Sequence, residues 1–317
     1  MVKPVLLITG GSGFLGRRLA LALKDRYEVV LGARNNKQNS LAKDMTGCTT
    51  VPLDVTSIES VRDAFRRYEP VVVVHAAATK FVDLAERQPL ECLDVNVVGS
   101  QNVARVAIDS PAETVLGIST DKAAPPVRNT YGLSKALMER LFCSLDGTAG
   151  TRFLCVRYGN VAWSTGSVLP VWKRMHEEAG IIRTTGPDMR RFFFSVDEAA
   201  ALVETALSRA DELSGRVLCR EMKAAQIQDV LDTWIEMRGG SWERMKGRPG
   251  ERSDEFLIGD LELPFTRELE IAGLRHFVIS FNERVPVPLA SGLSTANAER
   301  LTHEEIKGLI EGEPEAL

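Results

Sequence analysis

The chain has 317 residues, a formal net charge of −4 at pH 7 and a composition that is ordinary for a globular enzyme. This length can bury a large core, and the small negative charge gives no electrostatic reason to expect nucleic acid as a partner. The apolar runs have the length of strands, and the first residues lack the apolar stretch of a signal peptide. These features predict a cytoplasmic protein that binds neither nucleic acid nor membranes.

The cysteines and histidines form no familiar pattern. The five cysteines include no Cys-x-x-Cys pair, and the four histidines lack the spacing of metal ligands. We therefore expect reduced thiols and no metal site.

Strands and helices are predicted to alternate in the first half of the chain. Short apolar runs predict strands at Val5–Ile8, Val29–Leu31, Thr50–Leu53, Val71–Val74, Val115–Ile118 and Phe153–Val156. Apolar residues at helical spacing predict helices over Phe14–Lys24, Ile58–Tyr68, Leu90–Ile108 and Tyr131–Leu145. This alternation predicts an α/β fold with a Rossmann-like, doubly wound parallel sheet.

The alternation loosens after Asn160. Further helices are expected over Leu169–Glu178, Val196–Arg209, Ala225–Arg238 and His303–Ile310, with short strands and Gly- and Pro-containing loops between them. We interpret this part as a smaller, mainly C-terminal lobe that closes over the edge of the sheet.

A glycine-rich turn follows the first predicted strand and opens the first helix. The spacing of Gly10, Gly13 and Gly16 permits a tight turn and a close approach of the backbone to a pyrophosphate. Arg34, where NAD sites usually have an acid, favours the 2′-phosphate of NADP; a solvated surface arginine is the alternative. Asp54 is either an adenine contact or a turn residue. The predicted cofactor contacts are Gly10, Ser12, Gly13, Phe14, Leu15, Gly16, Arg34, Asp54, Val55, Ala76, Ala77, Tyr131 and Lys135.

Two short stretches carry the chemistry. Tyr131 and Lys135 lie one helical turn apart, so a nearby ammonium is expected to lower the pKa of the phenol and make it a base for a hydroxyl proton. Asp121 and Lys122 follow an apolar strand and add an acid and an amine, which suggests proton transfers beyond simple hydride transfer. The alternatives are an ordinary amphipathic helix and an exposed turn with two solvated charges.

With these residues, the chain resembles the extended short-chain dehydrogenases/reductases. Within them it is similar to the soluble, C5-inverting UDP-N-acetylglucosamine 4,6-dehydratases that begin pseudaminic acid biosynthesis. The resemblance spans nearly the whole chain, through Gly10–Gly16, His75–Lys80, Asn96–Gly99, Ser119–Ala123, Tyr131–Lys135, Arg157–Val161, Gly166–Pro170, Met189–Phe192, Arg248–Glu251 and Asn297–Leu301. The motifs at Ser119–Ala123, Arg157–Val161 and Arg248–Glu251 are more specific than the glycine turn.

The resemblance implies a hydro-lyase that uses NADP in an internal hydride transfer and makes a UDP-4-keto-6-deoxy sugar. It implies that Tyr131, helped by Lys135, takes the proton of the C4 hydroxyl. Lys122, if neutral, would remove the C5 proton, and Asp121, if protonated, would donate to the departing C6 hydroxyl. Thr120 would lie near the C4 oxygen.

The resemblance also implies where the UDP-sugar binds. Arg248 is expected to pair with the pyrophosphate. Lys80, Asn160, Arg191 and Glu251 are further expected contacts. The implied partners are a UDP-sugar substrate and further copies of the chain in a homo-oligomer. The implied division is an NADP-binding domain of residues 1–162 with 191–220 and a nucleotide-sugar lobe of residues 163–190 with 221–317.

The chain departs from the family pattern near the expected sugar site. Phe81 replaces a frequent histidine, the segment with Pro125–Arg128 is one residue longer, and Arg190 replaces a threonine. A 4-epimerase or a dehydratase of a related sugar therefore stays open as an alternative, as does a non-catalytic NADP sensor.

Overall fold

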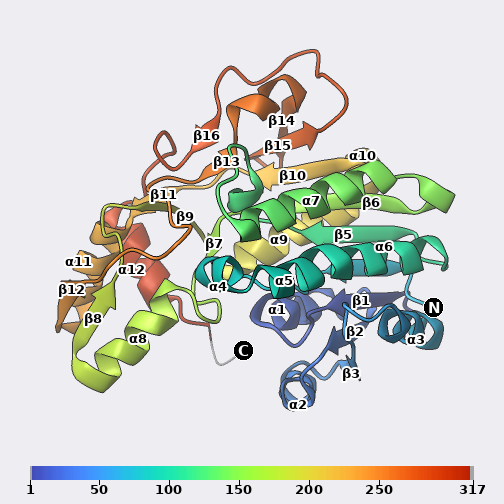
Figure 1. Ribbon diagram of the computed structural model, residues 1–317, viewed down its shortest axis with the longest axis horizontal. Helices are drawn as coiled ribbons and strands as arrows, with labels where there is room; N and C mark the ends of the chain where they lie inside the picture. Colours follow the sequence, from blue (N-terminus) through green and yellow to red (C-terminus); the bar gives the residue numbers. More distant parts are fainter. Residues whose placement is uncertain (1, 315–317) are drawn as a thin grey trace.

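The computed structural model describes residues 2–314 and consists of a large sheet domain and a smaller lobe (Figure 1). Its strands are β1 (Val5–Thr9), β2 (Glu28–Ala33), β3 (Thr49–Pro52), β4 (Val72–His75), β5 (Thr114–Ile118), β6 (Arg152–Arg157), β7 (Asn160–Val161), β8 (Ile181–Thr184), β9 (Arg190–Phe194), β10 (Arg216–Arg220), β11 (Ala224–Gln226), β12 (Ser241–Arg244), β13 (Phe256–Ile258), β14 (Thr266–Ile271), β15 (Leu274–Ser280) and β16 (Leu293–Ser294).

The helices alternate with these strands through most of the chain. The α-helices are α1 (Phe14–Leu23), α2 (Asn36–Thr46), α3 (Ile58–Tyr68), α4 (Val82–Arg87), α5 (Pro89–Leu93), α6 (Gly99–Ile108), α7 (Thr130–Leu145), α8 (Val168–Ala179), α9 (Val196–Ser208), α10 (Ala210–Leu213), α11 (Ile227–Arg238) and α12 (His303–Glu311). A π-helical stretch, η1 (Asp94–Val98), joins α5 to α6, and short 3-10 turns form η2 (Asp121–Ala123), η3 (Thr148–Gly150) and η4 (Asp260–Phe265).

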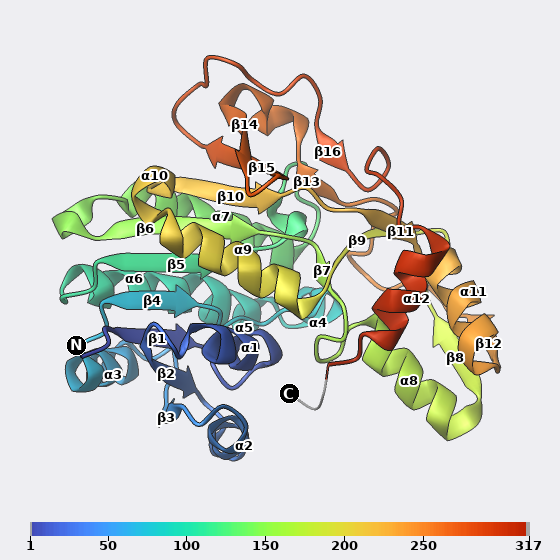
Figure 2. The ribbon, with the colours of Figure 1, turned by 180° about the vertical axis from the view of Figure 1, so that it is seen from behind.

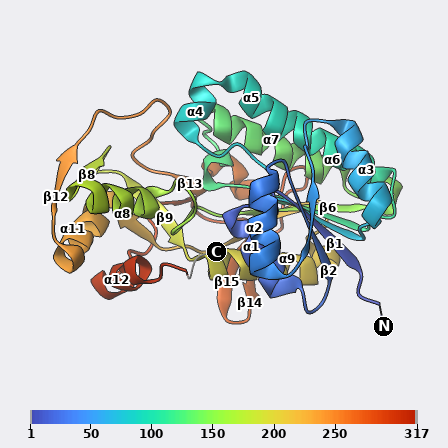
Figure 3. The same ribbon diagram turned by 90° about the horizontal axis from the view of Figure 1, so that it is seen from below.

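The large sheet has the predicted doubly wound, parallel arrangement. The described strands form one nine-stranded sheet in the order β14-β15-β10-β6-β5-β4-β1-β2-β3, parallel from β3 to β10 and antiparallel at β15 and β14. Helices α3, α6 and α7 cover one face, and α1 and α9 cover the other (Figures 2 and 3). The predicted Rossmann-like fold class is confirmed, because the predicted apolar runs became strands of this sheet, and β1, β4, β5 and β6 are almost entirely buried between the two helix layers.

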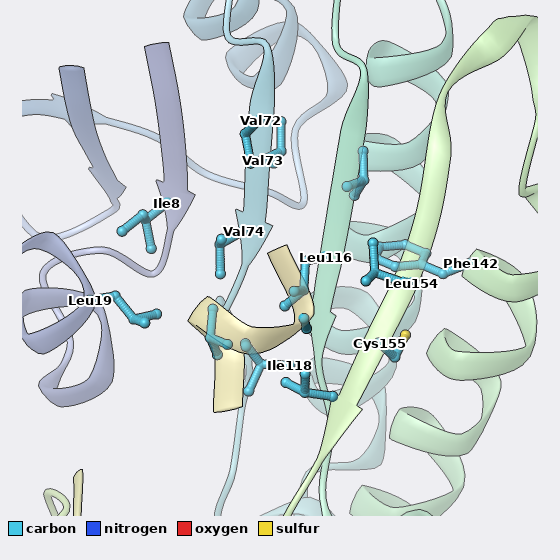
Figure 4. Packing of buried hydrophobic residues seen from close by; sticks show 14 of the residues in the cluster. Ile8, Leu19, Val72, Val73, Val74, Leu116, Ile118, Phe142, Leu154 and Cys155 are labelled. Atoms are coloured by element: carbon cyan, nitrogen blue, oxygen red, sulfur yellow. The ribbon is translucent and has the colours of Figure 1, made fainter. Parts of the chain in front are cut away.

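The main core lies between the sheet and its two helix layers. Figure 4 shows Val73, Leu116 and Leu154 on three neighbouring strands, together with Phe142 of α7; Val73 is on the same face of the sheet as Phe153, against which Phe142 packs, and Leu116 and Leu154 are on the opposite face. All four side chains are fully buried, and the ring of Phe142 meets that of Phe153 edge-on at 5.5 Å. This packing holds α7 against the sheet, and thereby the helix that carries Tyr131 and Lys135.

The structure differs from the sequence-based prediction in several places. Helix α2 was not predicted, because only Asn39, Ala42 and Thr46 are buried and its apolar pattern is correspondingly weak. The helix predicted over Leu90–Ile108 contains the π-helical stretch η1. Strands β14 and β15 lie within the range assigned to the lobe, 221–317, and yet extend the large sheet.

The smaller lobe has its own core, built on α8, α11 and α12. Trp172 and Trp234 are almost fully buried there, with ring centroids 6.3 Å apart, and Trp163 packs beside them. Strands β7, β9 and β11 form a small sheet beside this core. Within residues 2–314, no helix is both long enough and apolar enough to cross a bilayer.

Candidate active site

The glycine-rich turn forms a cradle at the carboxyl end of β1. Gly10 has a φ of +69°, and a Cβ there would lie 2.8 Å from the backbone of Ala77. A Cβ on Gly16 would lie 2.5 Å from the carbonyl oxygen of Gly11. Gly13, in contrast, is exposed at the N-cap of α1, and its Cβ would meet only the Gly10 carbonyl at 3.0 Å. Packing within the protein therefore explains Gly10 and Gly16, whereas Gly13 leaves room for a ligand such as a pyrophosphate at the helix N-terminus.

The other expected cofactor residues line this end of the sheet. Ser12 is buried, and its carbonyl accepts from Arg17 at 2.8 Å. Phe14 packs against the core of the smaller lobe, whereas Leu15 and Ala76 pack against the main core. The first turn of α1 thus contacts both lobes.

Residues after β2 and β3 form the far rim. Arg34 is exposed at the end of β2. Asp54 Oδ1 accepts from the backbone and the hydroxyl of Thr56, at 3.0 and 2.8 Å, so this carboxylate stabilises the turn before α3. Val55 is buried against Gly99. The turn interpretation of Asp54 is therefore seen directly.

Thr120, Asp121 and Lys122 lie together where β5 ends. Thr120 caps the 3-10 turn η2, and its hydroxyl donates to Asp121 Oδ1 at 3.0 Å. The Asp121 amide donates to the Tyr158 carbonyl at 2.9 Å, and its side chain has no solvent exposure. Oδ2 of Asp121 has no hydrogen-bond partner in the described part of the chain. The alternative of an exposed turn with two solvated charges does not hold for this pair.

The Lys122 ammonium is surrounded by side-chain oxygens that can accept hydrogen bonds. Its Nζ donates to Asp121 Oδ1 at 2.9 Å and to Asn160 Oδ1 at 3.4 Å, and lies 3.7 Å from Glu255 Oε1. Burial lowers the pKa of Lys122, but the charges of Asp121 and Glu255 outweigh burial, and the net pKa is raised. In the protein without ligands, these charges favour the ammonium form of Lys122.

Tyr131 and Lys135 lie on α7 and are both buried. Burial raises the pKa of Tyr131 to about 12, against the lowering effects of the Lys122 charge and the Thr120 hydroxyl. Burial lowers the pKa of Lys135 to about 8, and its Nζ lies 3.3 Å from Met138 Sδ. The charge that acts on the phenol is therefore that of Lys122, and the expected effect of Lys135 is not seen in the protein alone.

Glu255 is a site residue that the sequence did not reveal. It directly precedes β13 and is 2% exposed. Its side chain faces Lys122, although the two residues are far apart in the sequence. Its amide donates to the Thr295 hydroxyl at 3.0 Å, which fixes its backbone. In the sequence, only its position four residues after Glu251, the last residue of the Arg248–Glu251 motif, could have drawn attention to it.

The sequence model of a family described as "Polysaccharide biosynthesis protein" matches residues 6–271. The chain belongs to this family. Relatives with curated names include a nucleotide-sugar dehydratase and nucleotide-sugar epimerases, so the chain is an enzyme of the nucleotide-sugar dehydratase and epimerase group, with the fold of the solved UDP-glucose 4-epimerases.

Relatives within the family differ in length and in name. The probable polysaccharide biosynthesis protein EpsC of Bacillus subtilis is 33% identical over 275 residues, which cover 81% of this chain but 45% of EpsC. The UDP-N-acetylglucosamine 4,6-dehydratase (inverting) of Campylobacter jejuni is 31% identical over 278 residues, or 84% of this chain and 81% of that enzyme. The UDP-glucose 4-epimerase of Rickettsia conorii is 31% identical over 342 residues, which cover 98% and 96%.

A solved structure supports the same assignment. The X-ray structure of Pen from Bacillus thuringiensis superimposes with a TM-score of 0.89 at 27% identity, covering 98% of both chains. The fold is therefore shared over the sheet domain and the smaller lobe alike.

Of the five expected substrate residues, Asn160 and Arg191 lie near Lys122, whereas Arg248 and Glu251 belong to a separate loop. Asn160 contacts Lys122, and Arg191 is buried with its NH1 group donating to the Arg190 carbonyl at 2.7 Å. Arg191 also influences the pKa of Lys122 electrostatically, so it belongs to the same cluster. Lys80 is exposed, 5.8 Å from the ring of Phe81.

The second group is the loop of Arg248 and Glu251. Arg248 is exposed, and its amide donates to Glu251 Oε2 at 2.8 Å, so Glu251 closes this loop. Glu251 Oε1 also accepts from the Thr185 hydroxyl at 2.8 Å. The Gly250 carbonyl accepts from Asn129, the N-cap of α7, at 3.3 Å. The loop is thus placed beside the start of the helix that carries Tyr131.

Proposed function

We propose that this chain is an NADP-dependent UDP-N-acetylglucosamine 4,6-dehydratase that inverts C5. The observation that carries the proposal is the buried contact between Asp121 and Lys122, a short loop before the helix that carries Tyr131. A plain dehydrogenase needs only a hydroxyl base, whereas loss of water also needs a base for C5 and an acid for the C6 hydroxyl. The named dehydratase among the relatives supports this assignment.

The residues that would hold the dinucleotide are those of the glycine turn. Gly13 leaves the N-terminus of α1 open to a pyrophosphate, and Arg34 offers a cation for a 2′-phosphate. When bound, a nicotinamide supplies a hydride acceptor for C4 and returns the hydride to C6. Tyr131 takes the proton of the C4 hydroxyl, and the Thr120 hydroxyl orients that oxygen. Lys135 would also contact the cofactor.

The proton on Lys122 can move to the neighbouring carboxylate of Asp121. Transfer from its Nζ to Asp121 Oδ1, across the 2.9 Å contact, leaves a neutral amine and a neutral carboxylic acid. These are the two forms that elimination needs: the amine takes the proton from C5, and the acid donates to the departing C6 hydroxyl. After one elimination Lys122 is again an ammonium and Asp121 a carboxylate, so the pair returns to its starting charges. As the hydride returns to C6, C5 takes a proton from solvent on the opposite face, and Tyr131 releases to solvent the proton that it took from the C4 hydroxyl.

Sugar binding must uncover Asp121. Its side chain has no solvent exposure, whereas that of Lys122 is 13% exposed and forms the outer side of the pair. A sugar that displaces the Lys122 ammonium gains access to both groups. We propose that Asn160, Arg191 and Lys80 contact the sugar nucleotide, and that the exposed Arg248 pairs with its pyrophosphate.

Incubation with UDP-N-acetylglucosamine and catalytic NADP tests the proposal. Mass spectrometry should show a product lighter by one water, and proton NMR in D₂O should show solvent deuterium at C5 with the coupling pattern of the inverted centre. A deuterated product that keeps the original C5 configuration would sink the inversion but keep the dehydratase. No loss of water from any UDP-sugar, despite NADP binding, would favour the sensor alternative.

A UDP-sugar 4-epimerase is the second candidate. It is supported by the Rickettsia conorii epimerase, which aligns over nearly the whole chain. Epimerisation needs Tyr131 but gives no task to the Asp121–Lys122 pair. A product of unchanged mass, formed equally well by an Asp121→Asn variant, would favour this candidate.

We also propose which parts of the chain bind each ligand, where the enzyme is located and how it assembles. Residues 1–162 with 191–220 would hold NADP, and residues 163–190 with 221–317, apart from β14 and β15, would hold the UDP-sugar. Cytoplasmic location is proposed from the nature of the substrates. A homo-oligomer is supported by the exposed apolar side chains of Leu90, Leu133 and Leu137 on α5 and α7, and light scattering in solution tests it.

A further inference from the structure

Glu255 comes from a distant part of the chain to the innermost part of the site. Its carboxylate Oε1 lies 3.7 Å from Lys122 Nζ, on an ammonium that Asp121 already contacts at 2.9 Å. Glu255 is 2% exposed, and its Oε2 has no hydrogen-bond partner within residues 2–314. A buried carboxyl without donors is unusual and is often functional.

The groups that face Glu255 come from three elements. Lys122 and Asp121 lie on η2, and Arg191 lies on β9. Arg252, from the same loop, places its Nε 3.9 Å from Oε2 but directs its NH1 group to the Pro126 carbonyl at 2.9 Å. The cations therefore favour the carboxylate, whereas burial and Asp121 oppose it.

We propose that Glu255 is a positioning residue that decides whether Lys122 can pass its proton to Asp121. An ionised Glu255 holds Lys122 as an ammonium; a neutral Glu255 releases the proton. This inference rests on the proposed function, in which Lys122 must become a neutral amine.

The proton balance is simple. One N–H bond of Lys122 breaks, one O–H bond forms on Asp121 Oδ1, and Glu255 neither gains nor loses a proton in that step. Ionised Glu255 opposes the step because the ammonium is its nearest counter-charge, at 3.7 Å. Neutral Glu255 leaves Asp121 as the single charged partner of Lys122.

The electrostatics of the site agree with this geometry. Burial raises the pKa of Glu255, and the opposing charge of Lys122 does not cancel that effect. The neutral form of Glu255 is therefore populated at higher pH than for an ordinary glutamate.

The experiment compares Glu255→Gln with the wild type. Glutamine mimics a permanently neutral carboxyl, and Glu255→Asp keeps an acid one methylene farther from Lys122. Asp254→Asn is the matched control, because this neighbouring acid pairs with Arg190 at 2.6 Å. The first readout is kcat between pH 5.5 and 9. The second is the pKa of Lys122, measured in the protein alone by competitive acetylation and mass spectrometry.

We expect the ratio of the Glu255→Gln kcat to the wild-type kcat to rise about tenfold or more with pH, since one opposite charge moves a nearby pKa by about 1–3. The pKa of Lys122 should fall in Glu255→Gln, fall less in Glu255→Asp and stay unchanged in Asp254→Asn. A ratio that is flat with pH, or an unchanged Lys122 pKa, overturns the proposal. So does a folded Glu255→Gln protein that is about 100-fold slower at every pH, since Glu255 itself would then transfer the proton.

The two proposals fail separately. If the wild type releases no water from UDP-N-acetylglucosamine, the proposed function fails, while the acetylation readout still tests the coupling of Glu255 to Lys122. If the wild type is active and Glu255→Gln changes neither readout, this inference alone fails. Should Glu255→Gln not fold, the acetylation of Glu255→Asp against the wild type decides.

Discussion

Lys122 Nζ lies 2.9 Å from Asp121 Oδ1 in a part of the protein where Asp121 has no contact with solvent. The two side chains, adjacent in sequence, leave the end of β5 through a 3-10 turn that points both into the same space. In the proposed mechanism, transfer of one proton across this contact turns the ion pair into an acid and a base at one site.

Replacing Asp121 with Asn should abolish dehydration and leave cofactor binding intact. Asparagine keeps the size of the side chain and can accept from Thr120, but it cannot take the Lys122 proton or protonate a leaving hydroxyl. We expect kcat to fall by about 10²–10⁴. Turnover is measured by mass spectrometry and cofactor affinity by fluorescence titration; turnover within about threefold of the wild type would contradict the assigned role.

The sequence predicted the sheet well because its strands are continuous apolar runs buried on both faces, such as Val72–His75. It pointed to Asp121 and Lys122 as candidate site residues through their position after an apolar strand, and to Tyr131 and Lys135 through their spacing. It did not predict Glu255, because an acid in a loop looks solvated until the fold brings it to Lys122. Spacing also shows which residues share a helix face but not how deeply they are buried, and burial sets the pKa of Tyr131 and Lys135.

Alanine at Gly13 and at Gly16 should have opposite consequences. A Cβ on Gly16 meets the backbone of Gly11 at 2.5 Å, so Gly16→Ala should destabilise the fold by about 2 kcal/mol or more. A Cβ on Gly13 meets only the Gly10 carbonyl, at 3.0 Å, so Gly13→Ala should unfold close to the wild-type temperature. It should nevertheless weaken dinucleotide binding about tenfold or more, because the methyl group fills the space of the ligand. Equal losses of stability in the two variants would contradict this distinction.

Arg34 should decide between NADP and NAD. Replacing it with Ser removes the cation at the end of β2, so the affinity for NADP should fall about 10–100-fold while that for NAD changes less than about threefold. Lys37→Ser is the control, because Lys37 is exposed on the neighbouring helix α2. Calorimetric titration with each dinucleotide measures the ratio. An equal loss of affinity for both dinucleotides would remove Arg34 from the 2′-phosphate site.

Lys135 should lower the free energy of unfolding of the protein when no ligand is bound. It is 2% exposed, has no carboxylate at ion-pair distance within residues 2–314, and burial lowers its pKa to about 8. The folded state thus binds this proton less tightly than the unfolded chain. The penalty is full below about pH 8, at roughly 3 kcal/mol, and stability rises with pH between about 8 and 10.

Lys135→Met should therefore raise the free energy of unfolding by about 1–3 kcal/mol while abolishing turnover. Lys122→Met is the matched control: it leaves buried Asp121 without its cation and Glu255 with Arg252 alone at ion-pair distance, so it should destabilise the protein. Urea unfolding at pH 7 in the absence of dinucleotide measures both. If Lys135→Met loses stability as Lys122→Met does, the side chain is stabilised by contacts other than those described.

Arg157 should be the most sensitive charged residue for folding. It is fully buried on β6, and its guanidinium donates to Glu139 of α7 at 2.9 and 2.6 Å and to Glu262 of η4 at 2.9 and 2.8 Å. A fifth bond, to the Leu257 carbonyl at 3.0 Å, uses its last donor. The cluster therefore ties the helix of Tyr131 and Lys135 to the segment that follows β13.

Arg157→Met leaves two buried carboxylates without a cation and should cost about 3–5 kcal/mol of unfolding free energy. Arg152→Met, which removes an exposed partner of Asp211, should cost less than about 1 kcal/mol. Adding Glu139→Gln and Glu262→Gln to Arg157→Met should recover part of the loss, because the unpaired charges disappear. If Arg157→Met and Arg152→Met unfold at the same denaturant concentration, the buried cluster contributes no more than a surface ion pair, and the position of α7 must depend on its apolar packing against the sheet.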